Sequence, residues 1–109
     1  MRAAKVIYKN QEAGLLTQLD NGAFVFRYHD TWFNSADKPA ISLTLPKNQQ
    51  VYEAEHLFPF FYNMLPEGAN KQIACYALRI DKKDHFGLLL NTAASDTIGA
   101  VSIIKIDAI

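Results

Sequence analysis

The chain is 109 residues long, 50% hydrophobic and 20% charged, which is typical of one globular domain with a single core and argues against disorder. Eleven basic residues balance eleven acidic ones, so no net field would attract nucleic acid or an anionic membrane. The single cysteine excludes an internal disulfide, and the first ten residues contain no apolar signal segment. We therefore expect one cytoplasmic domain over residues 1–109, with no direct nucleic-acid partner and no membrane partner.

The first part of the chain reads as strands joined by turns. Strands are predicted at residues 5–9 and 15–19, with a break between them at Gly14. The pair Asn21-Gly22 favours the positive φ angles of a type I′ turn, which predicts a hairpin into a strand at 23–29. That strand alternates, and its core face is predicted to carry the following aromatic residues: Phe24, Phe26 and Tyr28.

Residues 30–39 form a polar, turn-rich segment that carries two large aromatic side chains, Trp32 and Phe33. These side chains are either tucked against the edge of the sheet or exposed to a partner, and the sequence leaves both alternatives open. Residues 40–45 alternate apolar and polar side chains, which predicts a fourth strand ending at Pro46.

The middle of the chain is expected to be helical. Apolar residues recur at helical spacing across residues 53–68, although Pro59 disfavours helical geometry at Phe58. A helix should therefore start near Phe58 or kink there, and Pro66 and Gly68 should end it.

Two further helices and a last strand are predicted after this segment. Residues 69–78 resume helical spacing, Asp84 is expected to cap a short third helix, and residues 99–106 read as an interior strand because they are β-branched and apolar. The predicted order is ββββαααβ, an α+β domain in which a mostly antiparallel sheet of about five strands packs against a small group of helices. One face of the second helix is predicted to carry its apolar residues: Ile73, Ala74, Ala77 and Leu78.

Residues suited to catalysis or metal binding do not converge in the sequence. Glu53, Glu55 and His56 are adjacent, but helical i,i+2 neighbours do not face each other, so a charged helix start is the commoner explanation. His29 and His85 have no nearby nucleophile with an orienting acid. We therefore expect no enzyme activity, no cofactor, and no catalytic, cofactor-binding or metal-binding residues.

Two local patterns look like chemistry but have structural explanations. Asp84-His85-Phe86-Gly87 resembles the Asp-Phe-Gly of kinases with an inserted histidine, yet the other kinase motifs are missing, so a helix cap and a core phenylalanine are predicted. Cys75 falls inside the second predicted helix, where a buried small hydrophobic residue is expected rather than a reactive thiolate.

Several motifs together resemble the N-terminal subdomain of HipA-type kinase toxins. They are FFYNMLPEG at 60–68, FGLL at 86–89 and IGAV at 98–101, with GLL at 14–16 and FVFRY at 24–28. HipA proteins are several times longer, and their ATP-binding and catalytic motifs lie in later regions that this sequence lacks. A free-standing version of the subdomain resembles HipS, the small member of tripartite HipB–HipS–HipT toxin–antitoxin modules.

The resemblance implies a non-catalytic bacterial antitoxin that binds and neutralises a HipT-type serine/threonine kinase, with a HipB-type DNA-binding protein in the same complex. Two alternatives stay open: an N-terminal fragment of a full-length HipA-type kinase toxin, or a non-inhibitory adaptor between the kinase and HipB. The residues themselves, and not the family, suggest the partner interface. The predicted interface residues are Trp32, Phe33, Asn63, Leu65, Pro66 and Glu67.

Overall fold

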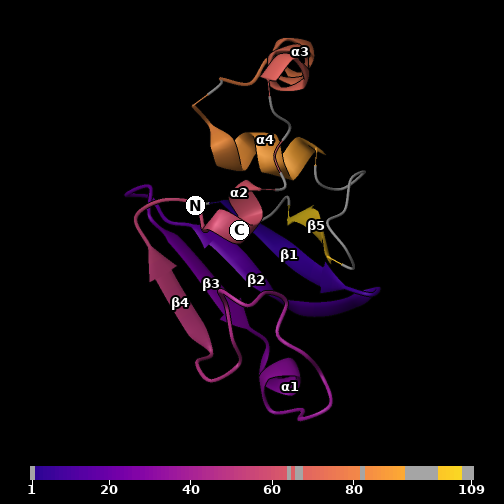
Figure 1. Ribbon diagram of the computed structural model, residues 1–109. Helices are drawn as coiled ribbons and strands as arrows, with labels where there is room; N and C mark the ends of the chain where they lie inside the picture. Colours follow the sequence, from indigo (N-terminus) through magenta and orange to yellow (C-terminus); the bar gives the residue numbers. More distant parts are fainter. Residues whose placement is uncertain (1, 64, 66–67, 82, 93–100, 107–109) are drawn as a thin grey trace.

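The computed structural model describes residues 2–63, 65, 68–81, 83–92 and 101–106. These residues form a five-stranded sheet in the order β4-β3-β2-β1-β5, with every neighbouring pair antiparallel, which confirms the predicted α+β class (Figure 1). The strands are β1 (Arg2–Tyr8), β2 (Gln11–Gln18), β3 (Phe24–Tyr28), β4 (Val51–Ala54) and β5 (Val101–Ile106). The helices are α1 (Asp30–Phe33), α2 (Pro59–Tyr62), α3 (Gly68–Leu78) and α4 (His85–Thr92).

Figure 1 shows α2 and α4 over one face of the sheet, with α3 stacked beyond α4 and α1 at the opposite end of the domain. None of the helices in the described part of the chain is long and apolar enough to cross a membrane. The strand β1 pairs with β2 on one side and with β5 on the other, where Ala3 lies opposite Ile106. The beginning and the end of the described chain are therefore neighbours in the sheet.

The aromatic face predicted for β3 is confirmed. Phe24, Phe26 and Tyr28 are buried, whereas Arg27 points to solvent from the other face. The Phe24 ring meets the ring of Phe86 from α4 edge-on, with 5.6 Å between centroids. Because side chains alternate across a strand, this one strand supplies a continuous apolar row beneath the helices.

The type I′ turn predicted after β2 occurs instead in the hairpin between β1 and β2, for which no turn was predicted. The β2–β3 hairpin is confirmed, but of the Asn21-Gly22 pair only Gly22 has a positive φ, at 89°, so the type I′ turn is wrong there. The Leu19 N–H instead donates to the Ala23 carbonyl at 2.8 Å and closes a three-residue loop. Both residues between β1 and β2 have positive φ, at 48° and 67°, so the type I′ geometry occurs at Lys9-Asn10.

The break predicted at Gly14 is wrong. Gly14 lies inside β2, opposite Val6 on one side and Tyr28 on the other. A Cβ atom at Gly14 would lie 2.5 Å from the Arg27 carbonyl oxygen and 2.9 Å from the Phe26 ring. Glycine is therefore required here for the close approach of β2 and β3.

The fourth strand predicted at residues 40–45 is wrong, because these residues belong to a loop. The fourth strand of the structure is β4, which lies later in the chain. Ile41 and Leu45 are buried, whereas Leu43 between them is 99% exposed. The buried hydroxyl of Tyr28 fixes the loop: it accepts a hydrogen bond from the Ile41 N–H at 3.1 Å and donates one to the Leu45 carbonyl. Burial raises the pKa of the Tyr28 hydroxyl, which keeps this donor protonated.

The long helix predicted over residues 53–68 is mostly wrong. Its first residues extend β4, and the helix α2 begins only at Pro59, after an extended Phe58. The predicted start near Phe58 is confirmed, since proline restricts the residue before it and is well suited to the first helical position.

The last strand also differs from the prediction. In the described residues it begins at Val101 and forms an edge of the sheet, so the interior position expected for it is wrong. Ile104 on this strand is 48% exposed. Most of the second predicted helix corresponds to α3 and the third to α4.

The predicted cap at Asp84 is confirmed and has a second role. Its carboxylate accepts a hydrogen bond from the Gly87 N–H at 3.1 Å, which caps α4. The guanidinium of Arg2 from β1 reaches the same carboxylate with two N–H groups, at 2.7 and 3.0 Å, and lies over the Phe86 ring. The hydrogen bonds from Arg2 hold the pKa of Asp84 below its ordinary value. This pair ties the first strand to the start of α4.

We predict that Gly14→Ala destabilises the domain by about 2 kcal/mol, because the added methyl group clashes with backbone and with a core ring. Chemical denaturation followed by circular dichroism measures the change. Leu43→Ala, at an exposed side chain, is the control and should stay within ~0.5 kcal/mol of wild type. Equal unfolding midpoints for Gly14→Ala and wild type would contradict the close approach.

We also predict that Asp84→Asn, which keeps a capping oxygen but loses the charge, lowers the free energy of unfolding at neutral pH by less than about 1 kcal/mol, since both members of the pair are partly exposed. The folded-state pKa of Asp84 is lowered, so its contribution is present above the ordinary value of 3.8 and is lost as the pH falls through the folded-state pKa. Denaturation curves from pH 7 downward measure the difference between the two proteins. Glu55→Gln is the control, and a difference for Asp84→Asn that persists in full at the acid end would refute the charge effect.

Candidate functional site

The predicted interface residue Trp32 is tucked into the domain, which decides between the two alternatives left open by the sequence. Its side chain is 3% exposed, its indole N–H donates to the Pro39 carbonyl at 2.9 Å, and its ring meets Tyr8 edge-on at 5.7 Å. The ammonium group of Lys38 covers the indole face at 4.9 Å. Phe33 is half-buried and packs against the core. Trp32 therefore anchors the loop after α1 and offers little surface to a partner.

The second group of predicted interface residues follows α2. Asn63 is exposed and ends that helix. Leu65 is buried in the core cluster, so this predicted interface residue offers little surface to a partner. Pro66 and Glu67 lie outside the described residues. The structure thus brings Asn63 to the surface and takes Leu65 away from it.

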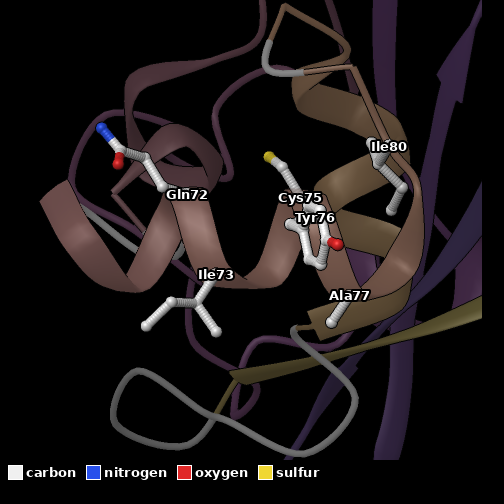
Figure 2. Close-up of a pocket in the computed structure, with 6 residues that line it drawn as sticks. All are labelled: Gln72, Ile73, Cys75, Tyr76, Ala77 and Ile80. Atoms are coloured by element: carbon white, nitrogen blue, oxygen red, sulfur yellow. The ribbon is translucent and has the colours of Figure 1, made fainter.

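A groove along α3, which the sequence analysis missed, has a mostly apolar lining. It has a volume of about 590 Å³. Ile73 is 66% exposed and Tyr76 is 89% exposed, whereas Cys75 between them is buried (Figure 2). The lining residues are Gln72, Ile73, Cys75, Tyr76, Ala77 and Ile80.

The apolar face predicted for this helix lies on the exposed side of α3. Ile73, Ala77 and Leu78, three of the residues predicted to share that face, are all exposed. The buried position predicted for Cys75 is confirmed. The side chain of Ala74 lies outside the described part. Since α3 packs on α4, the side of the helix that carries Cys75 is the covered one, and the opposite side faces away from the domain.

Three of the residues follow helical spacing on this outer side. They stand at i, i+3 and i+4, which places them along one face of the helix. We call this set the α3 stripe: Ile73, Tyr76 and Ala77. The spacing is visible in the sequence, but Cys75 and Leu78 make a competing apolar face, so periodicity alone could not show which face is free.

The end of α3 is fixed by a Schellman motif. Arg79 adopts a left-handed conformation with φ of 55°. The Ile80 N–H donates to the Cys75 carbonyl at 2.9 Å, and the Arg79 N–H donates to the Tyr76 carbonyl at 3.3 Å. This geometry turns the chain sharply and brings Ile80 back beside Cys75, where it packs against the core and borders one end of the groove.

The groove is suited to contact rather than to catalysis. Among the side chains that the structure describes, the lining has none that is charged, and its polar groups are an amide, a thiol and a phenol. Arg79 and Asp81 border the adjoining hollow at the end of the helix. Nowhere in the described part of the chain do three or more potential metal-ligating His, Cys, Asp or Glu side chains gather. An apolar lining with a polar border is the composition expected of a binding surface.

Titratable side chains meet elsewhere, on the β1–β2–β3 part of the sheet. The Glu12 carboxylate contacts the imidazole of His29 and lies 3.5 Å from the ammonium group of Lys5. Cys75 is on α3, beyond α4 from the sheet, and so cannot join this group as a nucleophile. The cluster is best explained as cross-strand pairing of opposite charges.

Comparison with known proteins identifies the domain. The family model for the HipA N-terminal domain matches residues 4–104. An "Uncharacterized protein" of Haemophilus influenzae is 33% identical over 103 residues, covering 94% of this chain and 92% of its own length. "Putative kinase Y4mE" of Sinorhizobium fredii is 26% identical over 107 residues, covering 98% of this chain and 25% of its own length.

A solved structure described as the N-terminal domain of HipA toxin is 32% identical, with a TM-score of 0.74, and the match covers 100% of this chain and 96% of that chain. This chain spans about a quarter of Y4mE but nearly all of the Haemophilus protein. The matched region is the HipA N-terminal domain and not the kinase catalytic domain. On these grounds the chain belongs to the HipA N-terminal domain family.

Proposed function

We propose that this chain is a non-catalytic antitoxin that binds and neutralises a HipT-type serine/threonine kinase in the bacterial cytoplasm, in a complex with a HipB-type DNA-binding protein. The observation that carries the proposal is the occurrence of one domain in two settings. It makes up a quarter of a protein named as a kinase, and it makes up nearly all of the Haemophilus relative. A domain that accompanies a kinase within one chain is suited to acting on a kinase from a separate chain.

The surface chemistry supports a role through contact. The described side chains of the groove on α3 are mostly apolar and uncharged, which suits packing against another protein. Inhibition then requires preferential binding to the inactive kinase. To move a kinase from 99% active to 99% inactive, the antitoxin must bind the inactive state ~10⁴-fold more tightly, because equal affinity for both states shifts nothing.

The interface predicted from the sequence is part of the proposal where it presents surface. Asn63 is exposed and Phe33 is half-exposed, so both remain candidates for kinase contact. Trp32 and Leu65 would act indirectly, because each holds a neighbouring surface segment in place.

We predict that co-expression of this chain with the HipT-type kinase from the same genome restores growth. Purified chain at saturation should lower kinase autophosphorylation at least ~10-fold, a coupling typical of regulatory partners. Measuring phosphate incorporation with and without the chain tests this expectation. Full kinase activity in a complex shown to have formed by gel filtration would contradict inhibition and favour the adaptor.

The alternative of a HipA fragment is favoured by one observation, the match to only a quarter of Y4mE. Sequencing the gene downstream of the codon for Ile109 separates the two cases. A stop codon followed by a separate kinase reading frame favours the antitoxin. A frame that continues into a kinase region would make this chain the first domain of a toxin.

A further inference from the structure

We propose that the α3 stripe is the part of this chain that anchors it to the kinase, by packing into an apolar groove on the kinase surface. The inference rests on the proposed function and names the surface that performs it. The three positions of the stripe have the i, i+3, i+4 spacing with which a helix binds a groove on another protein.

The exposure of the stripe is the first argument. Tyr76 is 89% exposed and Ile73 is 66% exposed on adjacent turns of one helix. Single exposed apolar residues are ordinary on protein surfaces, but a contiguous row of them marks an interaction site. Tyrosine is also enriched among the residues that contribute most to binding energy, because its large ring brings little conformational entropy.

The placement and rigidity of α3 are the second argument. The helix lies on the far side of α4 from the sheet, so a partner can reach its outer face without disturbing the core (Figure 1). The Schellman motif at Arg79 fixes the carboxyl end of the helix next to the stripe. A surface that is already ordered loses little entropy on binding, which favours affinity.

The relatives argue for a kinase as the occupant. In Y4mE the matched domain is 25% of the chain, so a body about three times its size is attached to it. A face that is apolar and uncovered on the isolated domain is the face such a body would cover. The described side chains that line the groove are uncharged, and Arg79 and Asp81 stand at one end of it. The complementary surface on the kinase is therefore an apolar groove with polar groups at one end.

The test measures the affinity of the full chain for the purified HipT-type kinase from the same genome, by isothermal titration calorimetry. Tyr76→Ser and Ile73→Ser should each weaken binding, the former at least ~30-fold, as expected for a central aromatic contact. Leu43→Ser is the matched control. It also removes an exposed apolar side chain, but from the loop between α1 and β4, which lies away from α3, and it should change the affinity less than ~3-fold (Figure 1).

A second variant guards against loss of folding. Ala77→Arg removes no contact within the domain and suits a helix, but it adds a long side chain at an exposed position of the stripe. It should retain the wild-type circular dichroism spectrum and weaken binding at least ~30-fold. Hydrogen exchange should show the α3 amides more protected in the complex than in the free chain.

The possible outcomes distinguish a failure of the α3 stripe as the docking surface from a failure of the proposed antitoxin function. Unchanged affinity for folded Tyr76→Ser and Ala77→Arg, with wild type binding the kinase, overturns the stripe and leaves the proposed function standing. A wild-type chain that does not bind the kinase overturns both. A wild-type dimer in analytical ultracentrifugation that Tyr76→Ser converts to monomer, without loss of kinase affinity, would show a second copy as the occupant and overturn the proposal.

Discussion

The aromatic row on β3 is the constraint on which the rest of the structure depends. Each of its three side chains positions a different part of the chain. The ring of Phe24 meets Phe86 and positions α4, and the ring of Phe26 lies 5.8 Å from that of Phe61 and positions α2. The hydroxyl of Tyr28 forms hydrogen bonds with the backbone at Ile41 and at Leu45, and so fixes two points of the long loop that follows α1. A single five-residue strand thus organises two helices and a loop that are distant in sequence.

The same constraint explains why α3 is left with a free face. The row reaches α2 and α4 directly, but α3 packs on α4 and lies a layer further out. Cys75 provides its buried contact with the rest of the domain. Ile73 and Tyr76 on the opposite side of the helix stay exposed, so a fold that is well packed at its sheet presents an apolar surface at its outer end.

The sequence alone predicted the features that depend on local chemistry. The alternation of β3, the hairpin after β2 and the cap at Asp84 each follow from neighbouring residues, and each is confirmed. The strand predicted at residues 40–45 was wrong because a strand and a loop with two buried apolar side chains can have the same alternating pattern. The loop is favoured by the hydroxyl of Tyr28, which lies more than ten positions earlier in the chain. The turn at Lys9-Asn10 was missed because it carries no glycine.

The candidate site was harder to predict for a related reason. Helix α3 is apolar on two sides, and the choice between them depends on the position of α4, which periodicity cannot supply. The sequence left the burial of Trp32 open, and the structure buries this side chain because its N–H donates to a carbonyl within its own loop. Burial is decided by tertiary partners, and for large aromatic residues in polar loops these partners are not visible locally.

The pairing of β1 with β5 has a consequence for how the domain is made. Because the first strand must wait for the last one, the sheet cannot be completed while the carboxyl-terminal residues are still inside the ribosome. A free chain of this length therefore finishes folding after its release. In a longer protein that begins with this domain, β5 emerges while the rest is still being translated, so the domain can be complete before the following region appears. The same fold would then be completed after release in one case and during translation in the other.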